Sequence, residues 1–166
     1  MSEYRNRIKG LKYVKASELL PNPKNWRLHS EQQKSAMRGV LSEVGYADAL
    51  LARELDDGTL MLIDGHLRAD ITDDQDVPVL ILDVSESEAD YILATHDPIA
   101  GLADKNQDVL NELINSIESN NDAVNDMLNN LVDTMPDFVP ASIEDQGVLD
   151  QLKPIKCPKC GHEFQR

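Results

Sequence analysis

The stretch Leu60-Met61-Leu62-Ile63-Asp64-Gly65-His66-Leu67-Arg68 decides most of what the sequence says about the fold. Its first four residues are apolar and predict a buried strand. Gly65 then permits a turn, and the residues from Arg68 to Thr72 predict a helix start. A helix start after a glycine turn presents backbone N–H groups and the positive end of the helix dipole, which together bind anions. An arginine in the first turn can grip phosphate with two hydrogen bonds, so the stretch predicts a phosphate-binding site.

Two titratable residues flank the glycine of this turn. A carboxylate next to phosphates is how Mg²⁺ is usually held, so Asp64 is a candidate ligand for Mg²⁺ that accompanies a nucleoside triphosphate. His66 has an ordinary pKa of about 6.5 and is a candidate catalytic acid or base, or a donor to the phosphate. The alternative is a tight turn with a surface salt bridge, in which Asp64 only caps its own turn.

Length and composition fit one domain with appendages. Of the 166 residues, 41% are hydrophobic and 28% are charged, as in globular proteins that bury a core without disulfides. The sequence contains neither an apolar run long enough to span a bilayer nor the apolar segment of a signal peptide. These features predict a cytoplasmic protein without a membrane partner.

Charge is distributed unevenly along the chain. Residues 1–38 carry nine Lys or Arg against three Asp or Glu, whereas residues 39–153 carry four against twenty-six. An acidic body repels nucleic acid, so contact with DNA is expected only at the basic N-terminal segment or at the tail, residues 154–166. The simpler interpretation is a solvated acidic surface that aids solubility.

The pattern of apolar residues predicts both strands and helices. Asp56-Asp57-Gly58 between two apolar runs predicts a hairpin. Ser30 with Gln33, and Ser85 with Glu88, have the form of capping boxes and predict two helix starts. The predicted strands are residues 11–15, 49–52, 60–63 and 77–84.

The second half of the chain is predicted to be helical and then irregular. A break is expected at Asp97-Pro98, with the proline in the first turn of a new short helix that ends at Ala103. Apolar residues then recur at helical spacing, and prolines and weak periodicity follow. The predicted organisation is a domain over residues 1–104, a helical extension over 105–133, a linker over 134–156 and a Cys-x-x-Cys tail over 157–166.

Residues from about 11 to 104 resemble the ParB N-terminal domain, also called the ParB/sulfiredoxin-like or ParB-like nuclease domain. The order of features matches: a strand, an Asn-Pro loop from Asn22 to Arg27, a helix, a strand pair, the glycine–arginine turn, an apolar strand and an acidic helix. The Asp-Gly-His-x-Arg form at residues 64–68 is similar to the phage and plasmid branch. Residues 93–103 resemble the segment that follows this domain in proteins fused to, or encoded near, DNA methyltransferases.

The resemblance implies an α/β (α+β) fold, with a small mixed sheet and flanking helices, that binds a nucleotide or a DNA phosphate in one cleft. The turn of ParB itself reads Gly-Glu-Arg-Arg and binds cytidine triphosphate; Gly65 and Arg68 match it, while His66 replaces the acid and Leu67 replaces one arginine. The sulfiredoxin branch has a catalytic cysteine near this turn, and this sequence has none there. A free-serine kinase branch shares the Asp-Gly-His form, with the aspartate and histidine around the transferred phosphate, so kinase chemistry stays open.

The same resemblance extends the cleft to two further segments, one in the Asn-Pro loop and one near residue 95. Cationic and polar residues of these segments are expected to face the same anion as the turn. Trp26 is expected to anchor the loop in the core. The resemblance thus adds these phosphate-binding candidates: Asn22, Lys24, Arg27, Thr95 and His96.

The tail Cys157-Pro158-Lys159-Cys160-Gly161-His162 has the form of half a zinc ribbon. Structural zinc takes four ligands, and Cys157, Cys160 and His162 supply three at most. A second copy of the chain could supply the rest, which would make zinc a homodimer contact; otherwise the tail is inert. A thioredoxin-type redox role is not expected, because no strand is predicted before the motif.

Three functional hypotheses follow. The first is a ParB-like module that binds nucleotide or DNA phosphate and acts with DNA machinery, for example as the partner of a methyltransferase. The second is an enzyme on the same cleft, either a metal-dependent nuclease or a small-molecule kinase that uses a nucleoside triphosphate. The third is an interaction protein whose acidic helical half docks on a partner while the cleft is vestigial.

Overall fold

The structure is a computed structural model that describes residues 4–72, 74–132, 155–156, 158–160 and 162–164. The chain divides into two compact units, residues 1–132 and 133–166, which are described separately. In the described part of the chain, no helix combines the length and the apolar character needed to cross a bilayer.

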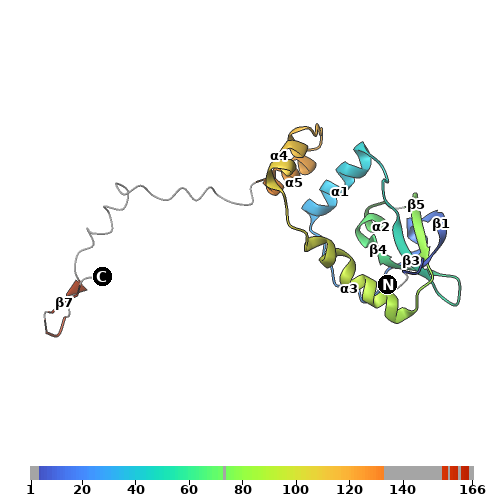
Figure 1. The fold of residues 1–166 in the computed structure, drawn as a ribbon, viewed down its shortest axis with the longest axis horizontal. Helices are drawn as coiled ribbons and strands as arrows, with labels where there is room; N and C mark the ends of the chain where they lie inside the picture. The colour runs from blue at the N-terminus through green and yellow to red at the C-terminus, as the bar shows by residue number, and fades with distance from the viewer. Residues whose placement is uncertain (1–3, 73, 133–154, 157, 161, 165–166) are drawn as a thin grey trace. The chain divides into compact units, whose positions relative to one another are not determined.

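A five-stranded mixed sheet forms the centre of the first unit, in the order β1-β5-β3-β4-β2 (Figure 1). β3 is antiparallel to its hairpin partner β4 and parallel to β5, and β5 is antiparallel to the edge strand β1. The β3–β4 hairpin turns at Gly58, which has φ +84°, as the Asp-Gly signal predicts. The strands are β1 (Ile8–Lys15), β2 (Leu19–Leu20), β3 (Leu50–Glu54), β4 (Leu60–Asp64) and β5 (Asp76–Leu82).

Both faces of the sheet are covered, which explains why its central strands are almost wholly apolar. Val77, Val79 and Ile81 of β5 belong to one buried cluster, against which Ala69 of the helix after β4 packs. Leu82 of the same strand belongs to the other cluster, together with Leu93 of the acidic helix. Side chains alternate along a strand, so the two clusters lie on opposite faces.

Capping residues set the starts of the two longest helices. α1 (Glu31–Glu43) begins after Ser30, whose side chain accepts a hydrogen bond from the backbone of Gln33. The Gln33 side chain contacts His29 Nδ1 at 3.0 Å, so this cap is one-sided. α3 (Glu86–Gly101) begins with a complete capping box of Ser85 and Glu88, as predicted.

The predicted helix break at Asp97-Pro98 is wrong. α3 continues through Pro98 to Gly101 as one helix. Proline lacks an N–H and normally ends or kinks a helix. Here it lies in the last turn, where only the final hydrogen bonds of the helix are affected, and Leu102 closes the end through the carbonyls of Ile99 and Ala100. His96 and Asp97 are therefore fixed on a helix.

The helical extension packs on the main domain. α4 (Gln107–Asn115) and α5 (Asp122–Val132) lie side by side next to α1 (Figure 1). Val124 of α5 is buried, and its side chain lies so close to Gly39 of α1 that a Cβ at Gly39 would come within 2.6 Å of it. Residues 1–132 consequently form one compact unit.

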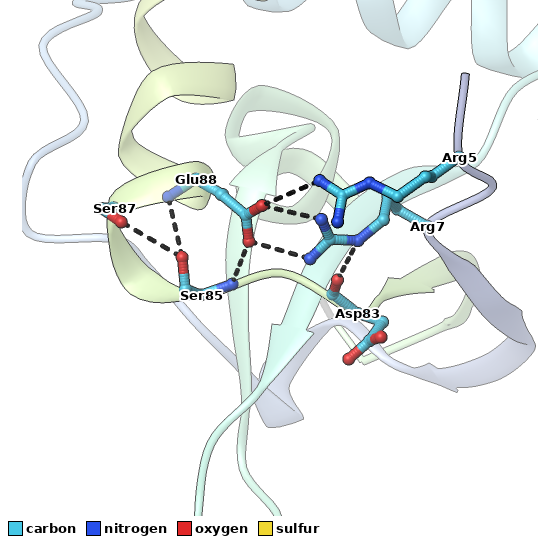
Figure 2. Close-up of polar contacts among 6 residues, drawn as sticks. All are labelled: Arg5, Arg7, Asp83, Ser85, Ser87 and Glu88. Carbon is cyan, nitrogen blue, oxygen red and sulfur yellow. Dashed lines mark hydrogen bonds and ion pairs between the residues drawn. The ribbon is translucent and has the colours of Figure 1, made fainter. Parts of the chain in front are cut away.

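An ion pair between Arg7 and Glu88 connects the N-terminal segment to the start of α3 (Figure 2). Arg7 donates from Nη1 and Nη2 to the two carboxylate oxygens of Glu88, at 2.7 and 2.8 Å, and from Nε to the carbonyl of Asp83 at 2.5 Å. Arg5 adds a longer ion pair. These contacts hold the pKa of Glu88 down to about 2, mainly through Arg7 and then through the backbone of Ser85.

The second unit contains a two-stranded antiparallel ribbon. β6 (Ile155–Lys156) pairs with β7 (Glu163–Phe164), and Pro158 to Cys160 form a turn between them. A strand thus does precede the Cys-x-x-Cys motif, contrary to the prediction. Strands of two residues carry too weak an apolar pattern to be predicted.

Candidate functional site

The strand–turn–helix stretch folds as its sequence predicts. β4 ends at Asp64, Gly65 has φ +91°, and α2 (His66–Thr72) follows at once. A Cβ at Gly65 would lie 2.5 Å from Cγ of buried Leu50. Positive φ and this contact both require glycine, so the turn brings the α2 amides close to the sheet.

A cavity of about 420 Å³ lies beside this turn. Five segments of the first unit form its wall, and the turn is only one of them. The lining includes Asn25, Arg27 and His29 of the Asn-Pro loop, Gln33, Met37, Val40 and Leu41 of α1, residues 45–48 after α1, residues 64–68, and His96 and Asp97 of α3.

Arg68 lies in the cavity wall with its charge divided between two carboxylates. Its Nη2 donates to Asp64 Oδ2 at 3.0 Å and its Nη1 to Asp48 Oδ2 at 3.1 Å. The Arg68 side chain is largely buried, whereas that of Asp48 is 77% exposed. The guanidinium thus makes one bond to each partner and a bidentate pair with neither.

Arg27, the second cavity arginine, has a partner on α3. Its Nη2 lies 2.8 Å from Asp97 Oδ2, but this buried nitrogen makes no aligned hydrogen bond with any described residue. The guanidinium also lies 5.0 Å from the centre of the Trp26 ring, within reach of a cation–π contact. Trp26 is 60% exposed, so the prediction that it anchors the loop in the core is wrong.

His66 holds the loop against the turn. Its Nε2 accepts a hydrogen bond from the backbone N–H of Asn22 at 3.1 Å, which leaves the ring proton on Nδ1. Burial lowers the pKa of His66 from 6.5, with Asp64 opposing and Arg27 reinforcing the shift. The ring is therefore neutral near pH 7, and Nδ1–H is the group that it can offer to a ligand.

Three cavity residues lie close enough to share a metal ion. Asp64, His96 and Asp97 each have a ligand atom within 4.8 Å of the others. They come from the end of β4 and the last turns of α3, so the uninterrupted α3 is what brings them together. Such a set of two carboxylates and an imidazole fits a divalent cation.

Of the nine residues that the sequence predicts for this cleft, six line the cavity and three do not. Lys24 Nζ pairs with Asp90 at 2.6 Å and Glu86 at 3.1 Å on α3, outside the cavity wall. Asn22 is buried and caps its own loop by accepting from the Lys24 N–H. Thr95 points back into α3, where its hydroxyl donates to the Tyr91 carbonyl. The six are Asp64, Gly65, His66, Arg68, Arg27 and His96.

The structure also adds cavity residues that the sequence did not reveal. Asp48 and His29 lie in irregular segments without a recognisable motif. Tyr46 hydrogen-bonds with Thr72 and fixes the segment that carries Asp48. Only tertiary packing brings them to the site. A carboxylate just before a predicted strand was the sole available signal.

The predicted zinc ligands lie in the second unit. Cys160 and His162 are exposed, and Cys157 lies outside the described residues. The ribbon pairs Lys156 of β6 with Glu163 of β7. Zinc binding at Cys157, Cys160 and His162 stays a prediction.

No protein-family model and no curated protein sequence matches this chain. In structure, however, the fold is similar to that of a ParB protein. The C-terminally truncated chromosome-partitioning protein ParB of Caulobacter crescentus, complexed with CTP-γ-S, aligns with a TM-score of 0.51 at 20% identity, over 64% of this chain and 60% of that one. A Pnob8-like ParB-N domain aligns with a TM-score of 0.45 at 16% identity, over 94% of this chain and 56% of that one. The first alignment supports the predicted ParB-like fold, and this chain spans less than two thirds of that protein.

Proposed function

We propose that the cavity binds a nucleoside triphosphate together with a divalent cation, with Arg68 and Arg27 facing the phosphates. The observation that carries this proposal is the pair of largely buried arginines whose carboxylate partners line the same cavity. The fold is similar to that of a ParB that was complexed with a CTP analogue, which supports a nucleotide as the ligand.

The charge of the cavity favours a nucleotide that brings a cation. Asp48, Asp64 and Asp97 outnumber the two arginines of the wall. A bare triphosphate would meet net negative charge, which weakens binding. A divalent cation near the carboxylates reverses that balance and leaves the arginines free to turn to phosphate oxygens.

The side chains present fit such a cation. Asp64 and Asp97 offer the oxygen ligands that Mg²⁺ prefers, and His96 adds a nitrogen suited to a transition metal. When bound, the cation would neutralise phosphate charge. The roles of this chain are to hold that charge with the two arginines, to present the first amides of α2, and to offer His66 Nδ1–H as a neutral donor.

A neighbouring hollow offers room for the rest of a nucleotide. It has a volume of about 510 Å³ and shares Arg27, His29 and His66 with the first cavity. Leu19, Leu62 and other apolar side chains form part of its wall. Such a surface suits the flat face of a nucleobase.

Thermal unfolding with a nucleotide panel tests the proposal. Each of the four ribonucleoside triphosphates is added with Mg²⁺, and at least one is expected to raise the midpoint of unfolding of the native chain. Arg68→Ala removes the shift, whereas Lys24→Ala, which removes a cation outside the cavity, leaves it unchanged. Unchanged midpoints with all four nucleotides contradict the proposal.

Catalysis is the second candidate function, favoured by the position of Asp64, His96 and Asp97 beside the phosphate-facing arginines. A metal-dependent nuclease or a small-molecule kinase would form product with Mg²⁺ and lose it in Asp64→Asn. Binding without product identifies a nucleotide-binding module. Binding of short DNA that falls steeply with salt would instead indicate contact with DNA phosphates.

The predicted partners keep their own tests. The methyltransferase partner remains a prediction from the resemblance, which co-purification from the native host would test. Zinc content of the chain by mass spectrometry, compared with Cys157→Ser, tests the tail, and sedimentation of both forms with and without a chelator tests a zinc-linked homodimer.

A further inference from the structure

α4 carries more apolar surface than α5 covers. α4 contacts α5, and Leu110 and Ile114 of α4 are half-buried. Val109 and Leu113 remain 59% and 57% exposed, and Ile117, just beyond the helix end, is 42% exposed. Single exposed apolar residues are ordinary, but these three recur every four residues.

The exposed residues extend the buried face of α4. Successive residues of an α-helix are about 100° apart, so Val109 and Leu113 form a row next to the row of Leu110 and Ile114. The apolar arc is therefore continuous, with one side half-buried and the other exposed. An exposed apolar row at this spacing is the kind of surface on which an amphipathic helix docks.

An acidic border runs along the uncovered side. Asp108 and Glu112 precede Val109 and Leu113 in the sequence and are exposed. Residues 104–132 hold six Asp or Glu and one basic residue, Lys105. Apolar groups bordered by uncompensated acid are complementary to a partner with an apolar stripe and basic flanks.

We propose that Val109, Leu113 and Ile117 with their acidic border form a docking surface for a basic amphipathic helix of another protein. Charge argues against two other occupants. Residues 133–152 of this chain hold five Asp or Glu and no Lys or Arg, so they would be repelled. The same face of a second copy would also meet like charge.

Fluorescence anisotropy with a labelled model peptide tests the surface. The probe is a helical Leu/Lys peptide of about 18 residues with all leucines on one face. Controls are a scrambled peptide of the same composition and a Leu/Glu peptide of the same pattern. The full chain is compared with Val109→Ser/Leu113→Ser and with Tyr91→Ser, whose side chain is 71% exposed on α3.

The native chain and Tyr91→Ser are expected to bind the Leu/Lys peptide alike, and the double variant about tenfold or more weakly. Weak binding of both control peptides is also expected. Equal binding of the scrambled peptide would show that only charge drives binding, and would overturn the proposal. Unchanged binding by a double variant with native circular dichroism would overturn it as well. Sedimentation that shows a dimer of the native chain and a monomer of the double variant would instead assign the face to a second copy.

Discussion

Two arginine sites in the same compact unit differ in how their charge is satisfied. Arg7 forms a bidentate pair: its two terminal nitrogens donate to the two oxygens of one carboxylate, and its Nε donates to a carbonyl (Figure 2). Arg68 divides its two contacts between carboxylates on different segments, and Arg27 keeps a buried nitrogen without an aligned hydrogen bond. The first arrangement fixes the guanidinium through three hydrogen bonds, two of them to one carboxylate, whereas the second can exchange its partners.

The difference shows how one residue pair can serve structure or binding. A bidentate pair whose carboxylate also caps a helix is fixed by several contacts, and breaking it would release all of them. A one-to-one contact with an exposed carboxylate such as Asp48 contributes little stability and is exchanged at little cost. The carboxylates therefore position the cavity arginines but can be replaced by a ligand as their hydrogen-bond partners.

The largest expected effect concerns the turn that positions Arg68. Gly65→Ala combines a strained φ with a contact to Leu50, and should lower the free energy of unfolding by about 3 kcal/mol. Gly58→Ala is the control, because Gly58 has a similar φ of +84° but open space around it, so it should cost about 1 kcal/mol. Urea unfolding measures both, and equal losses would show that the turn tolerates a side chain.

Replacing one arginine of each site by alanine tests whether the two sites serve binding and stability respectively. Arg68→Ala should weaken binding of the Mg²⁺–nucleotide by about 2 kcal/mol, because a charged hydrogen-bond donor is lost. Arg7→Ala should leave that affinity unchanged and lower the midpoint of thermal unfolding. Isothermal titration calorimetry at matched folded fractions measures both variants. Weaker binding by Arg7→Ala and unchanged binding by Arg68→Ala would instead place the ligand near the Arg7–Glu88 ion pair.

The stabilising effect of the Arg7–Glu88 ion pair should depend on pH. The pKa of Glu88 is about 2 in the fold against 4.5 as a free side chain, so its stabilising effect is fully present above about pH 4.5 and is lost as the pH falls toward 2. Glu88→Gln can keep the helix cap but removes the charge and one of the two acceptor oxygens that Arg7 uses. The difference in unfolding midpoint between the two chains is thus expected to shrink across this range, and a difference that stays constant with pH would contradict the assignment.

The smallest effect is expected at the exposed partner of Arg68. Asp48→Asn removes a competitor for the guanidinium and should strengthen nucleotide binding, by up to about threefold. Asp74→Asn is the control, because Asp74 is also an exposed partner of a cation, 74% against 77%. Calorimetry measures both, and equal gains would indicate a general effect of net charge.

The sequence predicted those parts of the molecule that depend on neighbouring residues. The β3–β4 hairpin, the Gly65 turn and the start of α3 each have a local cause in a glycine or a cap. Positions that depend on tertiary contacts were missed. Lys24 turned to α3, Trp26 stayed exposed, and Asp48 reached the cavity only through packing.

For the most direct test of the central claim, the native chain is titrated calorimetrically with the ribonucleoside triphosphate that raises its unfolding midpoint most, at constant ionic strength with Mg²⁺ or with EDTA. If the carboxylates of the cavity must be neutralised before its arginines can bind phosphate, saturable one-to-one binding is expected with Mg²⁺ and binding at least about tenfold weaker with EDTA. Equal affinity in the two buffers would show that the carboxylates need no cation, and no heat with any of the four nucleotides would show that the cavity does not bind them.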